Sequence, residues 1–155
     1  MRAVIALMIG ILAAFCVGSV IGTQIVLASV QSMGLDVTLA MRLSSSLSDL
    51  VGLSSSLLVL MAVALSCTWT LLIWLDRRRV LRASALWCLA VGAATVMLLH
   101  PALNFAFGVD VYAPARSLAG LAGQGLAGAL GGVALSRVLG ASRKPAGRRL
   151  NPPTR

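Results

Sequence analysis

Long apolar stretches alternate with short polar segments along the chain. Residues 3–30, 50–75, 80–107 and 115–139 consist mainly of aliphatic and small side chains, with few or no charges. A helix needs about 20 apolar residues to cross the hydrocarbon core of a bilayer. The pattern predicts four transmembrane helices that pack as one all-α bundle.

The segment between the first two stretches, residues 31–48, is also predicted to be helical. Its leucines recur at helical spacing, at Leu39, Leu43, Leu47 and Leu50. Asp36 is a candidate helix cap, and Gly52 with its serine neighbours is a candidate kink. We expect an amphipathic helix that either lies on the outer surface or extends the second transmembrane helix outward.

The composition agrees with this pattern. Hydrophobic residues make up 59% of the 155, charged residues only 11%, and the mean hydropathy is +0.96. Soluble domains are about half apolar and a quarter charged, so this chain has too few charges to cover a water-facing surface. We expect residues 1–140 to form the transmembrane domain. Residues 141–155 are basic, contain prolines and lack apolar periodicity, which predicts a disordered tail.

The basic residues predict the orientation. Of the 13 Lys and Arg, only Arg42 and Arg116 fall outside three places: the start of the chain, the 76–82 connection and the segment from Arg137 on. Cytoplasmic loops of membrane proteins carry the excess of basic residues, so both termini are expected in the cytoplasm. The basic loop and tail would lie against anionic lipid headgroups. Arg-, Ala- and Gly-rich usage is typical of high-GC bacteria and suggests the inner membrane.

Small residues follow the first and fourth apolar stretches at four-residue spacing, which permits close helix packing in lipid. The glycines expected to pack helices are Gly10, Gly18, Gly22, Gly123, Gly128 and Gly132. The spacing leaves open whether they join helices of one subunit or of two. Residues 123–128 also match the glycine pattern of dinucleotide-binding folds, but that motif requires a strand before it, and here it lies inside a membrane span.

The chain has a poor catalytic inventory. It contains one His and no Glu, so no common zinc motif can be assembled, and its three cysteines lie singly in apolar stretches. We expect no metal, no cofactor, no nucleic-acid binding and no enzymatic activity.

Polar residues inside membrane spans are costly and mark candidate sites. Here they gather in the predicted outer half of the bundle, at Gln24, Arg42, Asp49, His100, Asn104, Arg116 and Gln124. One interpretation is a pocket for a lipid headgroup, a quinone or another amphiphile. The other is that these side chains cap helices and hydrogen-bond neighbouring helices.

Two functions remain open at this stage. Rich small-residue packing beside a poor catalytic inventory favours a small non-enzymatic protein that acts as an accessory or stabilising component of a membrane assembly, as a homo-oligomer or within a larger complex. The alternative is binding or transport of an amphiphile through the outer polar residues.

Overall fold

The computed structural model describes residues 1–81, 83–108 and 112–141, and within these ranges every regular element is helical. The elements are α1 Arg2–Ser32, α2 Leu39–Gly52, η1 Leu53–Ser55, α3 Leu57–Arg77, α4 Ala85–Phe107, η2 Ala113–Arg116 and α5 Leu118–Ala141. In this part of the chain, four helices (α1, α3, α4 and α5) are long and apolar enough to cross a membrane. For the described residues, the predictions of an all-α fold and of four helices able to span a membrane are thereby confirmed.

The second span begins later than predicted. Residues 50–55, expected inside the span, form the end of α2 and the 3-10 turn η1, and α3 starts at Leu57 after a turn at Ser56. The hydroxyl of Ser54 donates to the carbonyl of Val51 at 2.6 Å. Gly52 and the serines that follow Leu53 are weak helix formers, and the interruption at these residues allows α3 to run in a different direction from α2.

Other boundaries move by smaller amounts. Thr38, and not Asp36, caps α2, because its hydroxyl accepts a hydrogen bond from the backbone N–H of Met41 at 3.3 Å. The third span starts at Ala85 instead of residue 80, with Ser84 as its cap. Apart from Ala141, the predicted tail lies outside the described residues.

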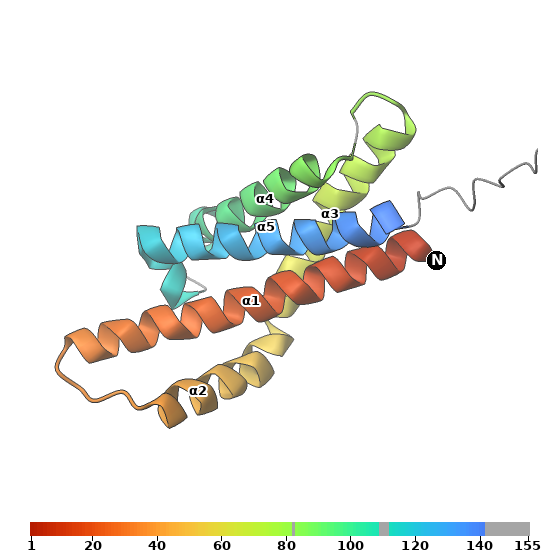
Figure 1. The fold of residues 1–155 in the computed structure, drawn as a ribbon. Helices are drawn as coiled ribbons and strands as arrows, with labels where there is room; N and C mark the ends of the chain where they lie inside the picture. The colour runs from red at the N-terminus through yellow and green to blue at the C-terminus, as the bar shows by residue number, and fades with distance from the viewer. Residues whose placement is uncertain (82, 109–111, 142–155) are drawn as a thin grey trace, which may run out of the picture.

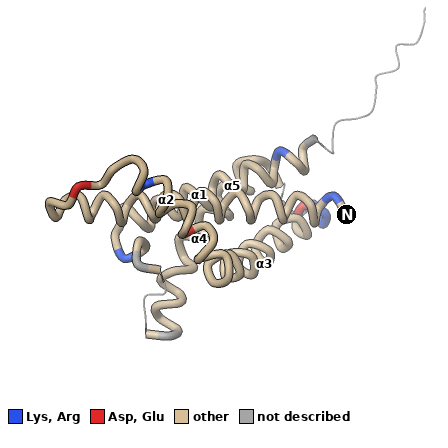
Figure 2. The backbone as a smooth tube through the Cα atoms, turned by 90° about the horizontal axis from the view of Figure 1, so that it is seen from below, with Lys and Arg blue, Asp and Glu red and all other residues tan. Residues whose placement is uncertain are grey.

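The bundle has two distinct ends (Figure 1). The start of α1, the end of α5 and the connection between α3 and α4 lie together at one end, and the turn from α1 to α2 lies at the other. Arginines gather at the first end (Figure 2), which we call the basic end: Arg2, Arg77, Arg78, Arg79 and Arg137. We call the opposite end, which carries the α1–α2 turn, the far end.

Trp69 of α3 lies at the centre of the core and is fully buried. Its indole ring packs against glycines of all three other spans, with Gly10 on α1, Gly92 on α4 and Gly131 on α5. The indole N–H donates to the backbone carbonyl of Cys88 on α4 at 3.3 Å. The missing side chains of the glycines make room for the largest fully buried side chain of the described residues, and its one polar atom is satisfied inside the bundle.

The small-residue rows lie at helix interfaces within the chain. Gly18 faces Gln124 and Ala127 of α5, and Gly22 faces Tyr112 and Pro114. The remaining predicted packing glycines also lie close to neighbouring helices, with Gly10 near Gly131, Gly123 near Ile21, Gly128 near Gly92 and Gly132 near Cys88. These rows therefore serve the α1–α5 and α4–α5 contacts of one subunit.

Candidate functional site

The polar residues that the sequence singles out fall into two groups at the far end. One group joins α1 to α2 along a partly buried line of hydrogen bonds. The other lies deeper, between α1, α4, α5 and the residues that precede η2. We call the first the polar seam, formed by Thr23, Gln24, Gln31, Arg42, Ser46 and Asp49, and the second the inner polar cluster, formed by Ser19, His100, Tyr112 and Gln124.

Arg42 is the centre of the polar seam. Its guanidinium donates to the side-chain oxygen of Gln24 at 2.7 Å and to that of Gln31 at 2.8 Å. The amide nitrogen of Gln24 in turn donates to the hydroxyl of Ser46 at 3.1 Å. Charge-assisted hydrogen bonds of this length are strong, so they fasten α2 along the second half of α1.

Asp49 closes the seam at its inner end. The hydroxyl of Thr23 lies 2.6 Å from the Asp49 carboxylate and 2.9 Å from the backbone carbonyl of Ser19. One hydroxyl proton serves one acceptor at a time, and the shorter distance is typical of a hydrogen bond to an ionised carboxylate. The two predicted charged residues of α2, Arg42 and Asp49, therefore both turn toward α1.

Gln124 anchors the inner polar cluster. It is fully buried, and its amide nitrogen donates to the backbone carbonyl of Gly18 at 2.9 Å. The phenol of Tyr112 reaches the same carbonyl at 3.4 Å. The glycine at position 18 lets α5 approach closely enough for this bond to form.

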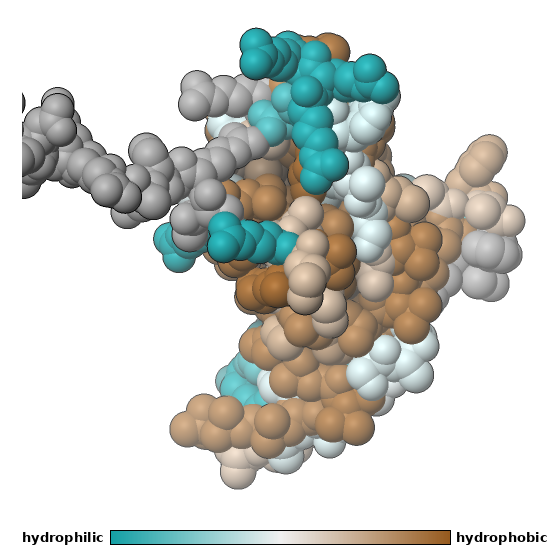
Figure 3. Space-filling view, turned by 90° about the vertical axis from the view of Figure 1, so that its right-hand side faces the viewer, coloured by the Kyte–Doolittle hydropathy of each residue, from teal (hydrophilic) through white to brown (hydrophobic). Residues whose placement is uncertain are grey.

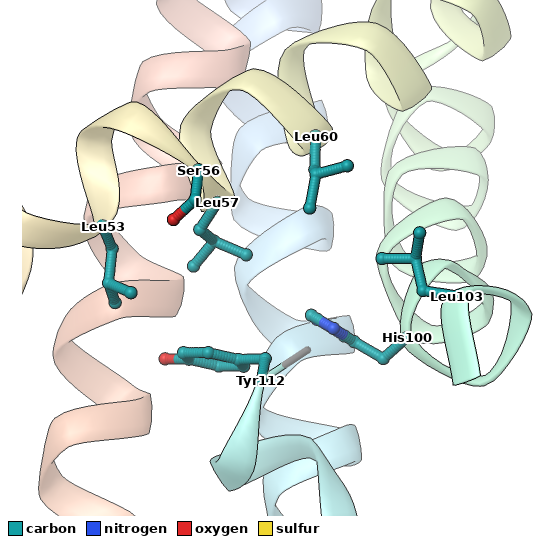
Figure 4. Close-up of a pocket in the computed structure, with 7 residues that line it drawn as sticks. All are labelled: Leu53, Ser56, Leu57, Leu60, His100, Leu103 and Tyr112. Carbon is teal, nitrogen blue, oxygen red and sulfur yellow. The ribbon is translucent and has the colours of Figure 1, made fainter. Parts of the chain in front are cut away.

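His100 and Tyr112 lie against each other beside a small cavity (Figure 4). Their ring centroids are 5.4 Å apart and the planes differ by 24°. The cavity measures about 20 Å³ and is otherwise lined by Ser56 and by leucines of η1, α3 and α4. A volume of this size admits one water molecule, so the closed bundle offers no space for an amphiphile at this place.

Several buried polar atoms of the cluster are unpaired. Among the described residues, the ring nitrogens of His100 and the side-chain oxygens of Gln124 and Ser19 form no hydrogen bond of good geometry, although the Gln124 side chain lies close enough to His100 to interact with it. His100 is only 8% exposed. Buried polar atoms are nearly always hydrogen-bonded in folded proteins, so this cluster has unused capacity to bind water or a small polar group.

Burial raises the pKa of Tyr112 to about 12, and the negative charge of Asp49 adds to the shift. Burial acts against the phenolate because that charged form is poorly solvated inside the protein. Tyr112 is therefore a neutral hydroxyl at physiological pH and is electrostatically coupled to the polar seam.

Of the seven predicted site residues, only His100 lines the cavity. Asn104 on α4 and Arg116 in η2 are both exposed, and neither lines the cavity beside His100. The seven predicted residues thus do not line a single pocket, because two belong to the protein surface and three to the seam between α1 and α2.

Sequence reasoning missed Tyr112 and Ser19 in the cluster and Gly92 in the core. Tyr112 lies in a loop between two spans, where a single tyrosine is typical of a membrane interface. Gly92 follows Cys88 by four residues, as Gly132 follows Gly128. This shared four-residue spacing of small residues on α4 and α5 is the sequence signal that could have identified Gly92 as a packing residue. No comparable signal marks Ser19.

Comparison with protein-family models, with curated protein sequences and with solved structures finds no match to this chain.

Proposed function

We propose that this protein is a non-enzymatic accessory component of a membrane assembly, and that it joins its partner through α2. The proposal includes the orientation inferred from the charges, with the basic end cytoplasmic in a bacterial inner membrane. The observation that carries it is the α1–α2 hairpin, in which polar side chains turn inward to the seam while Leu39, Leu43 and Leu47 of α2 turn outward.

The outward face of α2 is a continuous apolar row at four-residue spacing. The α2 apolar row consists of Leu39, Leu43, Leu47 and Val51, which are 73%, 60%, 65% and 76% exposed. Residues four apart lie on one helix face. No residue of α2 is buried, and although Leu50 packs against the core from its other face, the four side chains of the row contribute little to the fold of this chain.

The length of α1 supports placing much of the α2 apolar row outside the hydrocarbon core of the membrane. Its 31 residues span roughly 46 Å at 1.5 Å each, whereas the core is about 30 Å thick. If Arg2 marks the headgroup level at the basic end, the core ends near Thr23. Arg42 lies beside Gln31, so the start of α2 is then level with the headgroups or the water outside them.

Leucines that face water or headgroups at that level favour a contact that buries them. Removing a leucine side chain from water contributes about 1.5–3 kcal/mol, and surfaces of this kind mark interaction sites. The partner that fits is an apolar helix of another membrane-embedded subunit. The small-residue rows already pack helices of the same chain against each other. The proposed association therefore depends on α2 and not on these rows.

Site-specific photo-crosslinking in native membranes tests the proposal. A photoreactive amino acid at Leu43 or Leu47 is expected to yield a discrete protein adduct. The matched control is Val63, which is 63% exposed in the middle of α3 and is expected to give no such adduct. An adduct of twice the mass of the chain would identify the partner as a second copy.

Two results would contradict the proposal. If the α2 positions yield only lipid adducts, the apolar row faces the bilayer and nothing else. If Val63 yields the same protein adduct as Leu43, the contact is not specific to α2.

A further inference from the structure

A groove runs between α1 and α3 at the basic end, far from the polar seam and the inner polar cluster. It measures about 320 Å³, which is within the range of small-molecule sites. Ala3, Val4 and Leu7 form its α1 wall, and Ile73 and Trp74 contribute to its α3 wall. The walls are therefore almost entirely apolar.

A cation lines the groove where α3 ends. Arg77 contributes to the lining, and its guanidinium forms no ion pair or hydrogen bond with another residue of the described ranges. Beside it, the Arg78 guanidinium lies 5.2 Å from the centre of the Trp74 ring. Figure 3, which views this end, shows hydrophilic residues gathered around the ends of otherwise apolar helices.

A second polar group lines the groove farther from the end of α3. Thr70 contributes to the lining two turns before Arg77, on the same face of α3. The hydroxyl of Thr68, in the same helix, bonds to the backbone carbonyl of Ala64 at 3.1 Å. Thr70 makes no such bond within the part of the chain that the structure describes. Within the described residues, the groove thus combines a cation that has no bonding partner at one end with apolar walls and the Thr70 hydroxyl farther along α3.

We propose that this groove binds one anionic diacyl phospholipid. Its phosphate pairs with Arg77, and one acyl chain lies along the walls formed by Val4, Leu7 and Ile73. An anionic lipid is the partner that matches both parts of the groove, because its charge complements the unpaired guanidinium and its chain matches the apolar walls. An apolar helix of another protein would leave Arg77 unpaired.

Native mass spectrometry of the full chain in detergent, titrated with phosphatidylglycerol or phosphatidylcholine, tests this proposal. We expect one phosphatidylglycerol to bind at a lower concentration than phosphatidylcholine. Arg77→Gln is expected to weaken phosphatidylglycerol binding about fivefold, which corresponds to ~1 kcal/mol for one basic residue near a headgroup. The matched control is Arg137→Gln, because Arg137 is exposed at the same end but does not line the groove.

Filling the groove gives a second, independent measurement. Val4→Trp is expected to reduce binding of both lipids at least tenfold, because the ring occupies the space of the acyl chain. Met8→Trp is the control, since Met8 is 57% and Val4 58% exposed on the same helix and Met8 does not line the groove. Thermal unfolding of both variants establishes that each one folds.

Three outcomes would overturn the proposal. In the first, Arg137→Gln weakens phosphatidylglycerol binding as much as Arg77→Gln, which means that the charges attract lipid without a site. In the second, folded Val4→Trp binds lipid as the unaltered protein does. In the third, phosphatidylcholine binds as tightly as phosphatidylglycerol.

Discussion

Gly92 of α4 and Gly128 of α5 face each other across the helix interface, each with its α-carbon turned toward the other's backbone. A methyl group added to Gly92 would overlap the carbonyl oxygen of Gly128, and a methyl group on Gly128 would overlap the carbonyl oxygen of Gly92. The atoms in the way belong to the backbone and not to flexible side chains. The two helices approach this closely because both positions lack a side chain.

Gly92→Ala is therefore expected to destabilise the bundle by about 2 kcal/mol or more, in line with the cost of overpacking a tight interface. Unfolding in a mixed-detergent titration measures this change. Gly140→Ala is the control, because nothing lies within 4 Å of the position where its side chain would be added. Alanine is the better helix former, so this control should be neutral or slightly stabilising. Equal stabilities of the two variants would show that α4 and α5 do not pack as described.

His100 provides a second test, since the structure gives its ring nitrogens no partner among the described residues. His100→Phe retains the ring stacked on Tyr112 and removes two unpaired polar atoms, which cost about 1–3 kcal/mol when buried. We expect its stability to equal or exceed that of the unaltered protein. His100→Ala enlarges the cavity and should lower the unfolding free energy by about 2 kcal/mol or more.

Thermal unfolding in detergent separates these two variants. If His100→Phe is as unstable as His100→Ala, the imidazole has a polar partner on which the fold depends, such as the Gln124 side chain or a bound water.

The spans could be predicted from the sequence because hydropathy depends on local residues alone. The break between Gly52 and Leu57 shifted one boundary by seven residues, since a short run of glycine and serine interrupts a helix while the surrounding stretch stays apolar enough to be predicted as one span. The arrangement of the candidate site was harder to predict from the sequence. The position of each residue along its helix predicted that Gln24, Arg42 and Asp49 lie near the level of His100. That position does not show which face of the helix each side chain occupies. Only the fold of α2 back onto α1 separates the polar seam from the inner polar cluster.

Tyr112 can be titrated directly, because it is the only tyrosine in the chain. Its folded pKa of about 12 exceeds the ordinary value of 10.0, so the folded protein holds its phenol proton more tightly than the unfolded chain does. Stability from this group is complete below pH 10 and is lost as the pH rises toward 12. The ultraviolet absorbance of tyrosinate should accordingly appear near pH 12 in the folded protein and near pH 10 after denaturation.

Asp49→Asn tests the contribution of the carboxylate to this titration. Removing its negative charge should lower the pKa of Tyr112 while leaving the larger effect of burial in place. Tyr112→Phe should abolish the signal. A tyrosinate transition near pH 10 in the folded protein would contradict the buried position of this ring.

Arg42 gives the sharpest test of the hairpin on which the proposed function depends. Arg42→Met keeps an unbranched side chain of similar length but loses the bonds to Gln24 and Gln31. Hydrogen bonds to charged groups contribute about 1.5–3 kcal/mol, so α2 should open at least tenfold more often, and its amides should exchange with solvent faster by that factor. Ser44→Ala is the control, since the Ser44 hydroxyl bonds only within α2, to the carbonyl of Met41. The exchange of α5 should remain unchanged in both variants. Unchanged protection of α2 in Arg42→Met would mean that the outward leucines, and not the polar seam, hold the helix in place.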